Sequence, residues 1–315
     1  KNAIIAVVGP VAADCDAPLG AWRGHSFPSE VTSILEGIKE VYPNVTYAKG
    51  CDFDGDDRNG IAAAVRAARN SDVVVVCIGE KARWSGENHT RSTIALPAIQ
   101  EELLAAVAAT GKPVVVLIES GRPIDLVRIE PMADALMAIW HMGVREGQAV
   151  AGLLSGKYNP SGKLPITFPY TTGQCPMYYN ERPLCRRNQW GQYLDIQLEP
   201  KYPFGYGLSY ADFEYSDITL DGLTAKVSVT NKSDVDGKEA VLWFITDKAC
   251  SVVARPWKEL KYFEKKLIPA GQTVEFVYEI DKLGDLGFIN HEGERFFESG
   301  EFILSAGDKQ LTFRM

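Results

Sequence analysis

The chain has 315 residues, of which 46% are hydrophobic and 23% are charged, as is typical of globular proteins. It holds 33 Lys and Arg against 41 Asp and Glu, so its net charge is −8, and nucleic-acid phosphates are unfavourable partners for it. No uninterrupted apolar run approaches the roughly 18 residues of a membrane helix. At roughly 100–200 residues per domain, we expect a two-domain globular protein whose partners include neither nucleic acid nor a membrane.

The six cysteines are too few for a disulfide scaffold, and no two of them have the C-x-x-C spacing of many zinc sites. Cys175 and Cys185 flank a polar stretch, and the sequence leaves open whether they form a disulfide or remain free thiols. The chain begins at Lys1-Asn2 with neither a methionine nor a signal-peptide pattern. We therefore expect the numbering to begin inside a larger polypeptide.

The first half of the chain alternates between strand and helix patterns. Apolar strands are expected at residues 3–9, 73–78, 113–119 and 135–140, with a shorter strand at 45–47. Helices are expected at 61–70, 98–109 and 147–154, and one more runs from an N-cap at Ser29 to Tyr42-Pro43. Apolar strands separated by helices are typical of a mostly parallel sheet covered on both faces. We therefore predict an α/β sandwich domain over residues 1–170.

The composition changes after Tyr158. Residues 159–210 hold seven prolines and no clear period, which favours a long connector that lies against its neighbours; we assign 171–210 to it as a separate segment. The remaining pattern is all β, with strands expected at 223–230, 240–246, 260–267, 273–280, 302–306 and 311–313. This spacing predicts an immunoglobulin-like or fibronectin-III-like β-sandwich over residues 211–315.

One loop concentrates reactive side chains at the end of a predicted strand. It runs from Glu80 to Arg91, carries Trp84 and Glu87, and includes Ser85-Gly86, which permits close approach. Ligands of open α/β sheets bind at the carboxyl ends of the strands. An indole that keeps water from a carboxyl raises the pKa of that carboxyl, which suits a proton donor at neutral pH. A solvated charged loop is the alternative interpretation.

Several other catalytic motifs are absent. The first strand lacks a following G-x-G-x-x-G, Ser161-Gly162-Lys163 lacks the rest of a phosphate loop, and Glu119-Ser120-Gly121 is not the G-x-S-x-G of serine hydrolases. The histidines lack metal-ligand spacing, and each is interpreted as a surface or packing residue: His25, His89, His141 and His291.

Longer strings give the chain a resemblance to a known family. They are Asn159-Pro160-Ser161-Gly162-Lys163-Leu164-Pro165, Tyr202-Pro203-Phe204-Gly205-Tyr206-Gly207-Leu208-Ser209-Tyr210, Ser85-Gly86-Glu87 with Gly79-Glu80, Leu19-Gly20-Ala21-Trp22, and Arg255-Pro256-Trp257-Lys258-Glu259-Leu260. On these strings the chain resembles glycoside hydrolase family 3, the β-glucosidase and β-xylosidase group, over essentially its whole length. The resemblance implies the family's α/β sandwich and fibronectin-III-like domains, with its N-terminal (β/α)8 barrel missing. We interpret the first two strings as structural elements that hold the connector to the α/β domain.

The resemblance also implies a reaction. Retaining glycosidases use two carboxyl groups about 5–5.5 Å apart, and the resemblance places the nucleophilic Asp on the barrel and the general acid/base at Glu87. Glu80 is the rival, and the preferred interpretation is that it anchors the loop by hydrogen bonds. Trp22 is implied to flank the leaving-group sugar, with core packing as the alternative. Trp84 and Arg91 complete the candidate substrate-binding residues, although Arg91 alternatively pairs with a loop carboxylate.

The implied function is the C-terminal part of an exo-acting β-glucosidase-like enzyme that hydrolyses terminal non-reducing β-D-glucosyl residues. Its expected partners are a β-linked gluco-oligosaccharide or aryl glucoside and an N-terminal barrel domain or chain, without which this chain is expected to be inactive. No cofactor and no metal is implied, and the location implied by the family's habit of export is periplasmic or secreted. One alternative hypothesis is a non-catalytic carbohydrate-binding or assembly scaffold. Another assigns the fibronectin-like module to homodimer formation or wall attachment.

One segment departs from the family pattern. Residues 143–147 place Arg145 and Glu146 where relatives usually carry Glu and Gly. A charged side chain therefore stands where the backbone normally approaches its neighbours closely. We expect the local packing to differ there.

Overall fold

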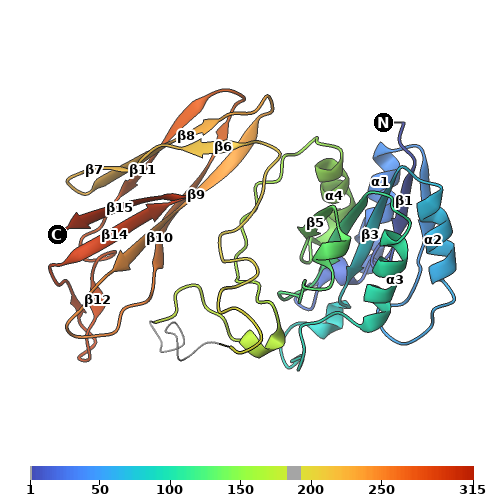
Figure 1. Ribbon diagram of the computed structural model, residues 1–315, viewed down its shortest axis with the longest axis horizontal. Coiled ribbons are helices and arrows are strands. Elements are labelled where there is room, and N and C mark those ends of the chain that lie inside the picture. Colours follow the sequence, from blue (N-terminus) through green and yellow to red (C-terminus); the bar gives the residue numbers. More distant parts are fainter. Residues whose placement is uncertain (1, 183–192) are drawn as a thin grey trace. The chain divides into compact units, whose positions relative to one another are not determined.

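The computed structural model describes residues 2–182 and 193–315, and Figure 1 traces the chain. It divides into two compact units. Unit 1 comprises Lys1–Tyr158 and Phe168–Cys175, and unit 2 comprises Asn159–Thr167 and Pro176–Met315. Cys175 is an exposed free thiol, whereas Cys185 lies outside the described residues.

Unit 1 is built on a five-stranded parallel sheet with the order β2-β1-β3-β4-β5. The strands are β1 (Ile5–Val8), β2 (Val45–Ala48), β3 (Val73–Gly79), β4 (Val114–Glu119) and β5 (Ala135–Ala138). The order reverses between β1 and β3, because β2 lies on one side of β1 and the later strands on the other. In sheets of this kind the loops at such a switch point form the binding crevice.

Helices cover both faces of this sheet. They are α1 (Ile34–Val41), α2 (Ile61–Arg69), α3 (Ala98–Ala108) and α4 (Glu146–Leu154). Helices α1 and α4 lie together on one face, and α2 and α3 on the other (Figure 1). The apolar strands are buried between them; Val74 to Glu80 are all buried, which explains why β3 lacks an alternating pattern.

The start of α1 differs from the prediction. Its N-cap is Ser33, whose hydroxyl accepts from the Glu36 N–H, while the Glu36 carboxylate accepts from the Ser33 N–H at 2.9 Å. This reciprocal pair satisfies two donors that the first helical turn leaves open. The predicted cap, Ser29, lies instead in a separate 3-10 turn, Pro28–Glu30. The prediction was wrong because it placed the cap before the apolar run as a whole. Only Ser33 has a glutamate three residues later, at the third helical position, whereas the third residue after Ser29 is Thr32.

Unit 2 is an antiparallel β-sandwich. One sheet has the order β10-β9-β14-β15, and the other has the order β11-β8-β6, with β7 also paired to β8. Its strands are β6 (Phe213–Tyr215), β7 (Thr219–Asp221), β8 (Thr224–Asn231), β9 (Gly237–Asp247), β10 (Glu259–Ile268), β11 (Thr273–Glu279), β14 (Glu301–Ala306) and β15 (Lys309–Arg314). A small hairpin joins β12 (Phe288–Ile289) and β13 (Arg295–Phe296). At two or three residues, β6, β7, β12 and β13 are too short to produce the alternation on which the sequence prediction rested.

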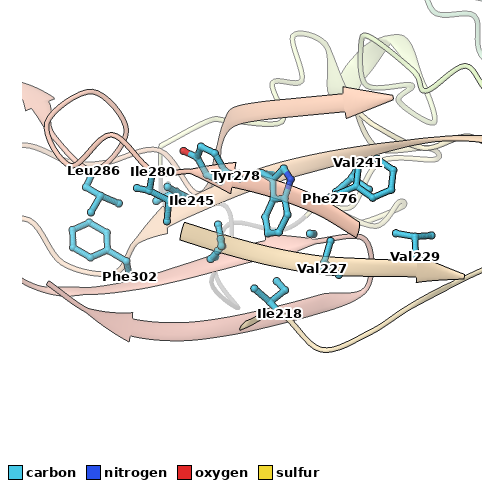
Figure 2. Close-up of a cluster of buried hydrophobic side chains, with 14 of the residues drawn as sticks. Ile218, Val227, Val229, Val241, Ile245, Phe276, Tyr278, Ile280, Leu286 and Phe302 are labelled. Carbon is cyan, nitrogen blue, oxygen red and sulfur yellow. The ribbon is translucent and has the colours of Figure 1, made fainter. Parts of the chain in front are cut away.

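The core of unit 2 lies between its two sheets (Figure 2). Its largest fully buried side chains are Trp243, Phe276 and Phe302. Each large apolar side chain buried in this way stabilises the fold by about 1.5–3 kcal/mol relative to an exposed one. The fibronectin-like unit therefore has a hydrophobic core of its own.

Both connector strings lie in unit 2. The Leu164 N–H donates to the Tyr206 carbonyl and the Gly205 N–H to the Leu164 carbonyl, each at 2.8 Å. Lys163 Nζ also lies 3.0 Å from the Glu239 carboxylate on β9. These bonds hold the two strings to each other and to β9. The interpretation that the strings hold the connector to the α/β domain stays a prediction.

Candidate active site

The candidate site lies at the carboxyl edge of the unit 1 sheet. Strands β3 and β4 run in register, so that Gly79 pairs with Glu119. The Glu80 N–H donates to the Glu119 carbonyl at 2.8 Å. The loop that begins at Glu80 therefore starts beside Ser120, the first residue after β4. This adjacency brings together two segments that are about forty residues apart in the sequence.

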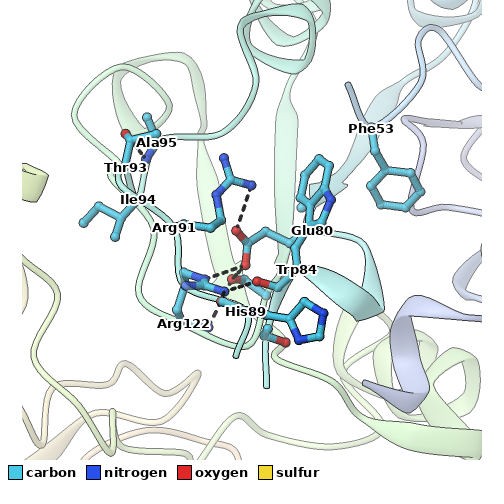
Figure 3. A network of polar contacts seen from close by, with 12 residues as sticks. Phe53, Glu80, Trp84, His89, Arg91, Thr93, Ile94, Ala95 and Arg122 are labelled. Carbon is cyan, nitrogen blue, oxygen red and sulfur yellow. Dashed lines mark hydrogen bonds and ion pairs between the residues drawn. The ribbon is translucent and has the colours of Figure 1, made fainter. Parts of the chain in front are cut away.

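Glu80 is the centre of a buried ion-pair network (Figure 3). Its carboxylate is 1% exposed. One oxygen, Oε1, lies 3.2 Å from Nη1 of Arg91, and the other, Oε2, lies 3.0 Å from Nε of Arg122. The Ser120 hydroxyl also donates to Oε2 at 2.9 Å. Glu80 thus ties the end of its own loop, through Arg91, to the segment that follows β4.

Arg122 also holds the middle of the loop. Its Nη2 donates to the carbonyl of Trp84 and, at 3.3 Å, to the carbonyl of His89. These two carbonyls bracket the segment that carries Glu87. One guanidinium, itself fixed by Glu80, therefore sets the conformation of this segment at both ends.

Glu87 lies in the tight turn between those two points. The turn is closed by the His89 N–H, which donates to the Gly86 carbonyl at 3.2 Å, and a ring nitrogen of His89 lies 2.8 Å from the Glu87 carbonyl. Asn88 has a φ of 61°, in the left-handed region that Asn tolerates better than most residues. Glu87 itself is exposed. Its carboxyl is therefore accessible, while the contacts described above fix the backbone that carries it.

Trp22 lies next to this turn. A Cβ added to Gly86 would lie 2.5 Å from Cβ of Ala21 and 3.7 Å from Nε1 of Trp22, and Gly86 has a φ of 107°. Glycine is therefore required there both by the backbone conformation and by the close approach of the two loops. The Trp22 side chain is 78% exposed, which excludes core packing within unit 1. The structure thus places Trp22 beside the segment that carries Glu87.

Trp84 and Arg91 form a second group on the same loop. The Arg91 guanidinium lies over the Trp84 ring at 4.8 Å from its centroid, and Lys81 Nζ lies at 5.2 Å. The ring edge also packs against Phe53 at 6.5 Å. Arg91 therefore contacts both the Glu80 carboxylate and an aromatic face, which is the pairing with a loop carboxylate that the sequence left open.

Sequence reasoning missed Arg122, Ser120 and the contacts of His141. Arg122 lies three residues beyond a predicted strand, and this was the only available signal. The His141 ring lies 3.3 Å from the Ser85 hydroxyl and 3.4 Å from the Glu119 carboxyl. Such contacts depend on the order of the strands in the sheet, which periodicity does not reveal.

Two buried carboxyl groups lie beneath this edge. Glu119 and Glu146 are both fully buried. Burial, together with the charge of Asp14, raises the pKa of Glu119 well above its usual range. Burial and the neighbouring Glu119 raise the pKa of Glu146 to about 9. Glu146 therefore carries a proton at neutral pH, and burial favours the protonated form of Glu119 as well.

Within residues 2–182 and 193–315, no group of His, Cys, Asp and Glu side chains is arranged to hold a metal ion. In the same part of the chain, no helix has the length and apolar character needed to cross a membrane.

Replacing Glu80 with glutamine is expected to lower the free energy of unfolding by about 2 kcal/mol. Removal of one partner of a fully buried pair costs about 3–5 kcal/mol, but here both guanidinium groups retain some access to water. Urea denaturation measures the effect, and trypsin should cleave the loop between Lys81 and Arg91 faster in the variant. The matched control is Glu102→Gln, because its partner Arg58 is more than half exposed. Equal changes in the two variants would contradict the anchoring role of Glu80.

Comparison with known proteins places the chain in a family. Residues 1–210 match the model of the glycosyl hydrolase family 3 C-terminal domain, and residues 239–310 match a fibronectin type III-like domain. The chain is 35% identical to the periplasmic beta-glucosidase of Salmonella typhimurium, a match that covers all of this chain and 46% of that protein. It is also 35% identical to a beta-xylosidase of Formosa agariphila, over 96% of this chain and 44% of that protein.

Solved structures give the same result. The structure of a β-glucosidase from Listeria innocua in complex with gluconolactone matches with a TM-score of 0.92 and 35% identity, over 100% of this chain and 45% of that one. The chain thus spans less than half the length of the relatives that it matches. The predicted fold class, a mostly parallel α/β domain followed by a fibronectin-III-like sandwich, is confirmed. The chain belongs to glycoside hydrolase family 3.

Proposed function

We propose that this chain is the C-terminal part of a retaining exo-β-glycosidase that removes terminal non-reducing β-D-glucosyl residues, and that Glu87 is its general acid/base. The observation that carries the proposal is the position of Glu87. Its carboxyl is exposed on a turn whose two ends are fixed by Arg122, and an exposed Trp22 lies beside it. A proton donor needs this combination of access and fixed position.

The rival carboxyl lacks access to a substrate. Glu80 is 1% exposed, and its two oxygens face Arg91, Arg122 and Ser120. Glu80 therefore serves the site by fixing the backbone that carries Glu87. Arg91 and Trp84 share this role through their contacts with Glu80 and with one another.

Trp22 supplies a binding surface for the sugar that leaves. The indole is 78% exposed, and an aromatic face suits the apolar C–H face of a pyranose ring. Stacking orients the sugar without requiring one pattern of hydroxyl groups. Both β-linked gluco-oligosaccharides and aryl glucosides therefore fit this position.

The second carboxyl of the reaction is proposed to come from outside this chain. A retaining mechanism needs a nucleophilic carboxylate about 5–5.5 Å from the acid/base, and we assign it to an Asp on an N-terminal barrel domain. The similarity to a periplasmic beta-glucosidase supports a periplasmic or secreted location. The similarity to a beta-xylosidase makes a β-xyloside the first alternative substrate to test.

The full polypeptide is expected to hydrolyse p-nitrophenyl β-glucoside and to release the β-anomer of glucose first, as followed by proton NMR. Residues 1–315 alone are expected to give no turnover, because they lack the proposed nucleophile. Release of the α-anomer would contradict retention. Sugar binding by the full polypeptide without any turnover would favour the scaffold hypothesis instead.

A further inference from the structure

His141 lies where the loops from four strands of the unit 1 sheet meet. Its Nε2 is 3.3 Å from the Ser85 hydroxyl, which precedes Glu87 by two residues. Its Nδ1 is 3.4 Å from Oε1 of Glu119, the last residue of β4. His141 itself follows β5, three residues after Ala138. The imidazole therefore links the loop that carries Glu87 to the end of two other strands.

The same ring also contacts the loop that carries Trp22. A Cβ added to Gly20 would lie 3.1 Å from Cδ2 of His141, and one added to Gly121 would lie 3.1 Å from Nε2. Glycine at both positions leaves room for the ring. His141 thus packs against the segment just before Ala21-Trp22 on one side and bonds to Ser85 on the other.

The backbone that presents His141 is strained. Trp140 has a φ of 54°, a left-handed conformation that bulky side chains rarely adopt. Its ring packs edge-on against Phe168, with 5.9 Å between the ring centroids. Strain of this kind persists only where the surrounding contacts determine the conformation, and it clusters at functional sites. Here it lies directly before His141.

The residue types Ser85, His141 and Glu119 match those of a hydrolase triad, but their environment does not support nucleophilic catalysis. Ser85 is only 7% exposed and Glu119 is fully buried. Burial raises the pKa of Glu119 and lowers the pKa of His141. Both shifts disfavour the carboxylate–imidazolium pair that a triad forms, so these contacts serve to position the loops.

We propose that His141 is a positioning residue that fixes the Ser85–Glu87 and Gly20–Trp22 segments at one spacing. The proton donor and the aromatic surface then approach the departing sugar as one rigid unit. This inference rests on the proposed function for its catalytic consequence. Its structural consequence, joint fixation of two loops, does not depend on that function.

The test measures both consequences in the full polypeptide with the variants His141→Ala, His141→Gln and Ser85→Ala. Hydrogen exchange followed by mass spectrometry is expected to rise at least about tenfold in His141→Ala, in peptides that cover residues 17–24 and 83–93 together. Ser85→Ala should affect only the 83–93 peptide. In His141→Gln the amide retains a donor and an acceptor, and exchange should return towards that of the unmodified protein. His291→Ala is the control, because His291 is exposed on unit 2.

Kinetics provide the second measurement. Hydrolysis of an aryl β-glucoside with a poor leaving group should lose about tenfold in kcat in His141→Ala with little change in KM, because misplacement of a catalytic group acts on the chemical step. His141→Gln should recover most of that loss. A purely structural role would lower the yield of folded protein but would not produce the split between kcat and KM.

The outcomes separate the two proposals. The positioning role would be overturned if, in His141→Ala, hydrogen exchange rose in neither the 17–24 nor the 83–93 peptide, or in only one of them. Exchange that rises in both, with no leaving-group dependence in a Glu87 variant, would support the positioning role and reject Glu87 as the acid/base. If His141→Ala does not fold, the same readouts on His141→Gln and Ser85→Ala decide: unchanged exchange at 83–93 in Ser85→Ala overturns the role.

Discussion

Replacing Glu87 with alanine is expected to lower kcat/KM for β-glucosides with poor leaving groups by about 10²–10⁴-fold, the usual contribution of general acid–base catalysis. A methyl or other alkoxide leaving group needs a proton as the glycosidic bond breaks, and Glu87 is the exposed carboxyl on the turn fixed by Arg122. An activated phenolate needs that proton far less. The loss for 2,4-dinitrophenyl β-glucoside should therefore be much smaller, and steady-state kinetics on the full polypeptide measure the difference.

Azide provides the complementary test. In a retaining mechanism, water attacks the glycosyl-enzyme intermediate with help from the acid/base acting as a base. Azide needs no such help, so it should accelerate Glu87→Ala and yield β-glucosyl azide. Glu40→Ala is the control, because Glu40 is exposed on α1 and away from the loop. Equal losses for both leaving groups, with no azide effect, would rule out Glu87 as the acid/base.

The sequence predicts the sheet elements of this fold well because burial leaves a clear pattern. Strand β3 is an apolar run since both its faces are covered, and β8 alternates since only one face meets the core. Helix starts are harder to predict, as Ser29 and Ser33 illustrate: both are candidate caps before the same apolar run. The glutamate three residues after Ser33 distinguishes them, because its carboxylate returns a hydrogen bond to the Ser33 N–H.

The candidate site was only partly predictable for a different reason. Glu80, Trp84, Glu87 and Arg91 lie on one loop, so the sequence places them together. Arg122 and His141 reach that loop only because β4 and β5 follow β3 in the sheet order. Strand order is a property of the fold and leaves no periodic signal, so the residues that hold the loop in place emerge only from the structure.

Glu146 provides the second large expected effect, on stability rather than on activity. It occupies the first turn of α4 and is fully buried, and no side chain among the described residues donates a hydrogen bond to its carboxyl oxygens. Next to it, a Cβ on Gly147 would lie within 3 Å of the carbonyls of Thr32 and Ser33, so the backbones of α4 and the start of α1 approach closely. The structure thus places a carboxyl in tightly packed surroundings, within the segment where the sequence predicts that the packing differs.

The direction of the pH dependence follows from the two pKa values of Glu146. In the unfolded chain its pKa is near 4.5, and in the folded chain burial and the nearby Glu119 raise it to about 9. Between these values the folded chain holds a proton that the unfolded chain has released. The free energy of unfolding therefore falls by about 1.4 kcal/mol for each pH unit over this window. Below pH 4.5 Glu146 is protonated in both the folded and the unfolded chain, so its titration no longer lowers the free energy of unfolding.

Glu146→Gln removes this titration while keeping the size and polarity of the side chain. We expect the free energy of unfolding of the variant, relative to that of the unmodified protein, to rise by about 3 kcal/mol between pH 4.5 and pH 7. Urea denaturation at half-unit steps from pH 4.5 to 8 measures the difference, with Glu40→Gln on the exposed face of α1 as the control. The amide does not titrate, so any effect of the substitution itself on stability is the same at every pH. It therefore does not change the slope of the stability difference plotted against pH. A difference that stays constant with pH would mean that Glu146 ionises in the folded chain as freely as in the unfolded one, and that its surroundings admit water or a cation that offsets its charge.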